Sequence, residues 1–100
     1  MTPKPLEFHP KAIQESRAAK IWYADRSRKA ELGFVRDLRH ALNQVAAFPH
    51  RWPGYVYGTR RYVFRKYPYF LVYREWSDRI EVIALAHQQR RPGYWAERLP

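Results

Sequence analysis

The sequence contains no cysteine and no long apolar run, and both absences exclude whole classes of protein. Without cysteine, the chain has no disulfide framework, no thiolate nucleophile and no cysteine-based metal site. No apolar run approaches the roughly 18 residues that a membrane helix requires. The opening segment, MTPKPLEFHPK, lacks the apolar core of a secretory signal peptide. We therefore expect a cytoplasmic protein that makes no contact with a membrane.

Sequence patterns for metal, nucleotide and serine chemistry are also missing. The four histidines are scattered singly, without the close spacing that metal-binding pairs show. No glycine-rich loop has the spacing of a phosphate cradle. The three serines, Ser16, Ser27 and Ser77, do not occupy the sharp turn of a nucleophile elbow. We therefore expect neither a metal nor a cofactor.

Acidic residues are scarce and unevenly placed. Nineteen Lys and Arg against nine Asp and Glu give a formal net charge of +10. No acid lies between Asp37 and Glu75, and the interval contains these basic residues: Arg39, Arg51, Arg60, Arg61, Arg65, Lys66 and Arg74. Surface charges of both signs are usually mixed, so this interval indicates a patch of one sign. Such a patch attracts nucleic acid, an anionic membrane or an acidic protein, although a merely basic surface is the alternative.

Periodicity predicts one domain over residues 1–100, of the α+β class. A short strand at 6–8 precedes a helix over about 10–26. Ser27 is a candidate N-cap for a second helix with apolar spacing from 30 to 48, which Pro49 ends. Three strands follow, over 61–65, 69–76 and 79–87. The predicted order is β-α-α-β-β-β, with two N-terminal helices packed on a small antiparallel sheet.

The first candidate site is the basic segment GTRRYVFRKYPY. Alternate residues of a strand share a face, so we expect Arg61 and Arg65 to point the same way and to hold consecutive phosphates. Arg60 and Lys66 would then lie on the opposite face, near the strand ends. The alternative is an edge strand whose charges protect it from aggregation.

The second candidate site is AHQQRRPGYW, at the end of the last strand. We expect His87 to share a face with Ile83 and Leu85 and to exchange a proton near neutral pH. A neighbouring arginine could stabilise a developing phosphorane, and Tyr94 could stack on a base or act as a weak acid. Alternatively, His87 caps the strand. For Trp95 we expect a packing role, because an indole near a chain end is usually an anchor.

Four segments together resemble one family. FHPKA…AAKIWY, LGFVRDLRHALNQVAAFP, GTRRYVFRKYPYFLVY and IEVIALAHQQRRPGYWAER are similar to the RelE/ParE superfamily of toxins from type II toxin-antitoxin systems. The resemblance covers about residues 6–98. It implies a bacterial growth inhibitor that a cognate antitoxin holds inactive. RelE-like members cut mRNA in the ribosomal A site, whereas ParE-like members poison DNA gyrase without nuclease chemistry.

The resemblance also implies roles for individual residues. In a metal-independent endoribonuclease, Arg61 and Arg65 would hold the phosphate, Arg90 would stabilise the transition state, and His87 or Tyr94 would move the proton. A second set would bind nucleic acid: Arg51, Arg60, Lys66 and Arg91. His87 favours cleavage of mRNA on the ribosome, and DNA gyrase is the alternative target. The central loop carries His50 and Arg51 where RelE-like members have several lysines. The net charge predicts an acidic antitoxin.

Overall fold

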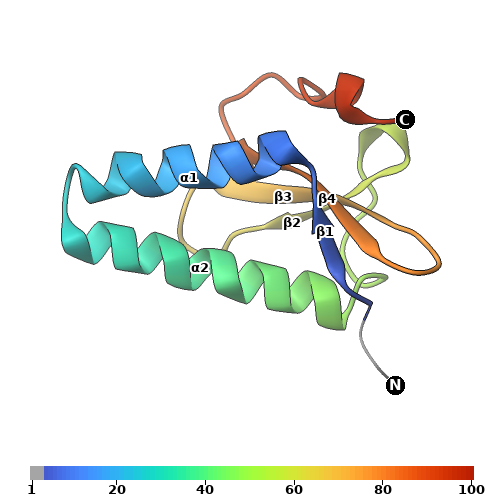
Figure 1. The fold of residues 1–100 in the computed structure, drawn as a ribbon, viewed down its shortest axis with the longest axis horizontal. Helices are drawn as coiled ribbons and strands as arrows, with labels where there is room; N and C mark the ends of the chain where they lie inside the picture. The colour runs from blue at the N-terminus through green and yellow to red at the C-terminus, as the bar shows by residue number, and fades with distance from the viewer. Residues whose placement is uncertain (1–3) are drawn as a thin grey trace.

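The computed structural model describes residues 4–100 as two helices against one four-stranded sheet (Figure 1). The elements are β1 (Leu6–Phe8), α1 (Pro10–Ala24), α2 (Arg28–Ala47), β2 (Arg60–Val63), β3 (Tyr69–Glu75) and β4 (Ile80–His87). Two short 3-10 helices, Val56–Gly58 and Ala96–Arg98, lie in the connections. The α+β class and the order β-α-α-β-β-β are therefore confirmed.

Both helices begin where local chemistry satisfies their free N–H groups. The side chain of Ser27 accepts a hydrogen bond from the Ala30 N–H at 2.9 Å, which confirms it as an N-cap. Pro10 opens α1, where its missing N–H costs nothing. The helix ends at Ala24, two residues earlier than the prediction. Neither helix of the described chain is long and apolar enough to cross a membrane.

The sheet differs from the prediction in one respect, because it is mixed rather than wholly antiparallel. Its strand order is β1-β4-β3-β2, with β2–β3 and β3–β4 antiparallel. The first strand pairs in parallel with β4, and Leu6 lies opposite Ile80. The two hairpins leave the outer edge of β4 unpaired. The N-terminal strand β1, which directly precedes α1, pairs with that edge. Because β1 has only three residues, it covers only the first part of that edge.

Apolar side chains cover both faces of the sheet. The helices cover one face, where Phe34, Ala41 and Val45 of α2 are fully buried. On the other face the C-terminal segment folds back, and Trp95 is fully buried against Val72 and Ala84. Figure 1 shows the helices side by side along one face and the C-terminal segment apart from them. The packing role expected for Trp95 is confirmed.

Candidate functional site

The structure separates Arg61 from Arg65 and so contradicts the expectation that both point the same way. The strand ends at Val63, and residues 64–68 form the turn that leads into β3. The Arg61 guanidinium lies 4.6 Å from the Tyr55 ring centroid, on the face away from the helices. The Arg65 Nη1, by contrast, lies 3.4 Å from Nε2 of His40 on α2. Even along one straight strand the two positions would be about 14 Å apart.

The other predicted nucleic-acid-binding residues are also dispersed. Arg60 Nη1 donates to the Trp52 carbonyl at 2.7 Å, so part of its donor capacity is used inside the fold. The Arg51 guanidinium is exposed and lies 4.0 Å from the Phe48 ring centroid. Lys66 lies in the β2–β3 turn near α2, and Arg91 is exposed after β4.

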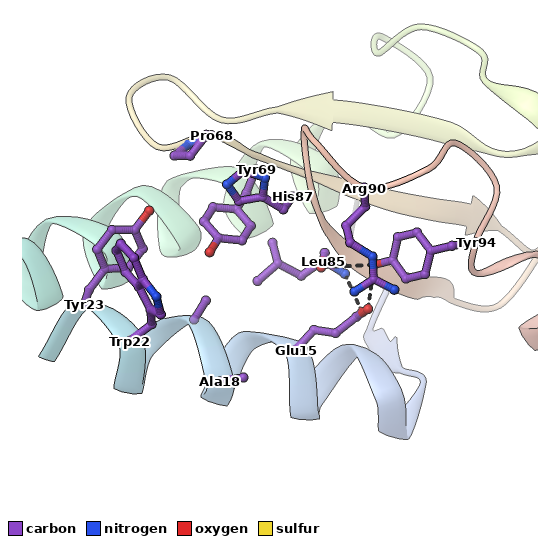
Figure 2. A pocket seen from close by; sticks show the side chains of 11 residues that line it. Glu15, Ala18, Trp22, Tyr23, Pro68, Tyr69, Leu85, His87, Arg90 and Tyr94 are labelled. Atoms are coloured by element: carbon purple, nitrogen blue, oxygen red, sulfur yellow. Dashed lines mark hydrogen bonds between the residues drawn. The ribbon is translucent and has the colours of Figure 1, made fainter. Parts of the chain in front are cut away.

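Three predicted residues do come together, at the end of β4. His87, Arg90 and Tyr94 line a cleft of about 470 Å³ between α1 and the ends of β3 and β4 (Figure 2). The opposite wall is formed by Trp22 and Tyr23 of α1. The Arg90 guanidinium lies 4.0 Å from the centre of the Tyr94 ring, in a cation–π contact.

His87 lies partly buried at the strand end and already makes local contacts. Its Nδ1 accepts a hydrogen bond from the Gln89 N–H at 3.1 Å, and its ring meets Tyr69 edge-on at 5.1 Å. It shares the helix-facing side with Leu85 but not with Ile83, which was predicted on that side. The reason is a β-bulge: Val72 lies opposite Ala84 and Tyr73 opposite Val82, so Ile83 is skipped and turns to the other face.

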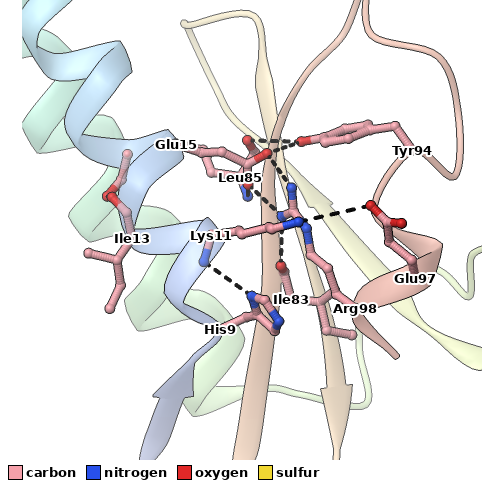
Figure 3. Close-up of polar contacts among 10 residues, drawn as sticks. His9, Lys11, Ile13, Glu15, Ile83, Leu85, Tyr94, Glu97 and Arg98 are labelled. Carbon is pink, nitrogen blue, oxygen red and sulfur yellow. Dashed lines mark hydrogen bonds and ion pairs between the residues drawn. The ribbon is translucent and has the colours of Figure 1, made fainter. Parts of the chain in front are cut away.

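Tyr94 belongs to a polar network that closes the edge of β4 left open by β1 (Figure 3). Its hydroxyl donates to Glu15 Oε2 at 2.5 Å. Arg98 donates to both Glu15 oxygens at 2.8 and 2.9 Å and to the Ile83 carbonyl at 3.1 Å. The Leu85 N–H donates to Glu15 Oε1 at 3.1 Å. Beyond Val82, the backbone hydrogen-bonding groups on this edge of β4 therefore pair with side chains instead of with a neighbouring strand.

This network changes the acid–base properties of its members. Burial raises the pKa of Tyr94 well above its ordinary value, and the hydrogen bond and negative charge of Glu15 raise it further. Burial alone would lower the pKa of Arg98, but the hydrogen bond and charge of Glu15 raise it overall. The Tyr94 phenol therefore keeps its proton and donates a hydrogen bond to Glu15, an arrangement that favours a structural role.

Sequence reasoning missed Glu15 and Arg98, the two charged residues that organise the cleft. A signal for Glu15 was present, because it lies three residues after Ala12 and four before Ala19, both of which are buried. A carboxylate on the apolar stripe of a helix indicates a buried polar partner. Nothing in the local sequence marks Arg98, whose partner is 83 residues away.

The fold defines the class of the protein. Two helices on one face of a mixed sheet, in the order β-α-α-β-β-β, are the architecture expected of the RelE/ParE toxins that the sequence resembles.

The comparisons identify the family within this class. Residues 6–92 match the family described as the ParE toxin of the type II toxin-antitoxin system, parDE, and the chain belongs to that family. A solved structure titled the chromosomal ParDE TA system from P. aeruginosa is similar, with a TM-score of 0.73 at 17% identity. The similarity covers 84% of this chain and 95% of that one. At this level of identity it shows that the two chains share a fold. No curated protein matches the sequence.

Proposed function

We propose that this toxin inhibits growth by binding DNA gyrase and does not cut RNA. The observation that carries the proposal is the dispersal of the residues expected to form a nuclease site. Arg61 lies on the far face of the sheet, Arg65 lies against α2, and Tyr94 is committed to Glu15. Cleavage by the 2′-hydroxyl needs a phosphate clamp, an acid and a base aligned on one phosphate.

Two further facts support inhibition by binding. The chain belongs to the ParE family, whose resemblance implies gyrase as the target. The cleft at the end of β4 combines exposed aromatic and charged groups, including Trp22 and Arg90, which are the residue types that dominate binding interfaces. Family membership also implies a cognate antitoxin as a partner.

Cleavage of ribosome-bound mRNA is the second candidate function, and one observation favours it. His87 and Arg90 line the same cleft, so a proton-transfer group and a cation lie near each other. The two functions differ in what they require of these side chains. A nuclease that uses this cleft loses activity when His87 is removed, whereas a gyrase inhibitor does not require proton transfer.

The test is to induce the wild type, His87→Ala and Arg61→Ala in growing cells and to map mRNA 5′ ends. We expect both variants to arrest growth as the wild type does, and no new 5′ ends to appear. Thermal unfolding of the purified variants checks that the fold is retained. Loss of arrest in folded His87→Ala, together with new 5′ ends after wild-type induction, would establish the nuclease instead.

A further inference from the structure

A groove beside α2 gathers cations that lie outside the cleft at the end of β4. The groove, of about 520 Å³, lies between the first half of α2 and the β2–β3 turn. Its cationic and titratable lining residues are Lys29, Arg36, His40, Arg65 and Lys66. Arg36, Arg65 and Lys66 are exposed at its mouth.

The only acid lining this groove is already used inside the fold. Asp37 is buried, and one of its oxygens accepts hydrogen bonds from the backbone N–H groups of Lys66 and Tyr67, at 3.0 and 2.9 Å. Within residues 4–100, no ion pair involves Lys29, Arg36, Arg65 or Lys66. The groove therefore has four permanent cations that form no ion pair, and its carboxylate is buried and hydrogen-bonded to the turn.

The walls of the groove are rigid. The Tyr67 hydroxyl donates to the Ala30 carbonyl at 2.9 Å, and its ring meets Tyr23 edge-on at 4.9 Å. Gly33 lets the Tyr67 ring approach α2, because a Cβ at position 33 would collide with the hydroxyl. The two Asp37 hydrogen bonds fix the turn that carries Arg65 and Lys66. The cations are thus displayed on a framework that does not have to form on binding.

We propose that this groove binds phosphodiester groups of nucleic acid. Arginine guanidinium groups form forked hydrogen bonds to phosphate, and lysines add point charges. An acidic helix would need apolar anchors as well as charges. The groove has no large aliphatic side chain for this purpose, because its uncharged lining residues are Ser27, Ala30, Gly33 and Tyr67. This inference goes beyond the proposed function, since binding of DNA to the groove can be measured without gyrase.

The test measures binding of purified toxin to a fluorescent 12-base-pair DNA duplex by anisotropy at several salt concentrations. Arg36→Gln combined with Arg65→Gln removes two cations of the groove. Arg17→Gln combined with Lys20→Gln removes the same charge from exposed positions on α1 outside the groove lining. We expect the first pair to weaken binding by roughly 10- to 100-fold, because each lost charged hydrogen bond is worth up to about tenfold. Its log–log salt slope should fall in magnitude by about 1.8, for two phosphates.

We expect the control pair to change affinity by less than about threefold, the effect of net charge alone. Equal losses from both pairs would overturn the site, because the binding would then follow overall charge. Tighter binding of a 12-residue polyglutamate than of DNA would assign the groove to an acidic protein segment. A matched single-stranded RNA that binds with the same dependence on Arg36 and Arg65 would support the site, because DNA and RNA share the phosphodiester group. The gyrase assay is separate, so inhibition without DNA binding would reject only this inference.

Discussion

At the scale of single residues, the Glu15 carboxylate has the largest structural role. It accepts hydrogen bonds from the Arg98 guanidinium, the Leu85 N–H and the Tyr94 hydroxyl. The Arg98 side chain is only 8% exposed, so the cation has little access to water if its partner is lost. Removal of one member of a buried pair costs more than the pair contributes, because the remaining charge stays buried.

We therefore predict that Glu15→Gln lowers the free energy of unfolding by about 2–3 kcal/mol. Urea unfolding of the purified protein measures the change. Glu97→Gln is the matched control, because Glu97 is 79% exposed and its contact with Lys11 is 3.9 Å long. That control should cost less than about 0.5 kcal/mol. A cost below about 1 kcal/mol for Glu15→Gln would mean that the network does not close the β4 edge.

Gly33 provides a second residue-scale prediction. In a free helix, Gly33→Ala would stabilise by about 1 kcal/mol. Here the new Cβ collides with the Tyr67 hydroxyl, which must leave its bond to the Ala30 carbonyl. We expect a net loss of stability of about 1 kcal/mol, measured by urea unfolding.

The control for Gly33 is the same substitution in a Tyr67→Phe background. Without the hydroxyl, the closest ring carbon lies 3.1 Å from the new Cβ, a tight but adjustable contact. In that background Gly33→Ala should be nearly neutral or stabilising. An equal cost in both backgrounds would show that the hydroxyl is not the cause.

The sequence predicts the local roles of individual side chains better than it predicts which side chains lie close together in the fold. Ser27 as an N-cap and Trp95 as an anchor follow from local chemistry, and both were predicted. The separation of Arg61 from Arg65 could not be predicted from alternation, because a turn replaces the strand after Val63. Asp37, like Glu15, lies among buried residues of a helix stripe, between Phe34 and Ala41. Such an acid is a signal that sequence reasoning can use.

At the scale of elements, the helices and the three hairpin strands were predictable and the role of β1 was not. Periodicity identifies each element, but it does not tell on which edge a three-residue strand pairs or in which direction. The parallel β1–β4 pairing depends on where α1 and α2 return the chain. The bulge at Ile83 could not be predicted either. Because β4 is apolar on both faces, its sequence has no apolar–polar alternation that a bulge would interrupt.

The C-terminal segment acts as an element in its own right, held by Trp95. The indole is fully buried and contacts Tyr55 and Tyr57, with ring centroids 6.0 Å apart in each pair. We predict that Trp95→Ala lowers the free energy of unfolding by about 3–5 kcal/mol, as measured by urea unfolding.

Trp95→Phe is the comparison for that prediction. The Nε1 of Trp95 is buried and has no hydrogen-bond partner among residues 4–100, so phenylalanine loses volume but no hydrogen bond. We expect it to cost roughly half as much as alanine, since it retains most of the buried aromatic surface. A near-zero effect of Trp95→Ala would mean that the segment does not cover the sheet in solution.

At the scale of the whole molecule, charge should govern association with the antitoxin. The formal charge of +10 is spread over exposed arginines and lysines on several elements. We predict that an acidic antitoxin segment binds quickly and that its association rate falls steeply as salt rises. Stopped-flow mixing at increasing NaCl measures this effect. A rate that is independent of salt would argue that apolar contacts alone guide the encounter.

The central claim is that this ParE-family toxin acts on gyrase by binding. The most direct measurement is the supercoiling of relaxed plasmid by purified gyrase in the presence of wild-type toxin and of His87→Ala. We expect both proteins to block supercoiling with similar concentration dependence, because inhibition does not need proton transfer at His87. Unchanged supercoiling at a large excess of folded wild-type toxin would exclude gyrase as the target.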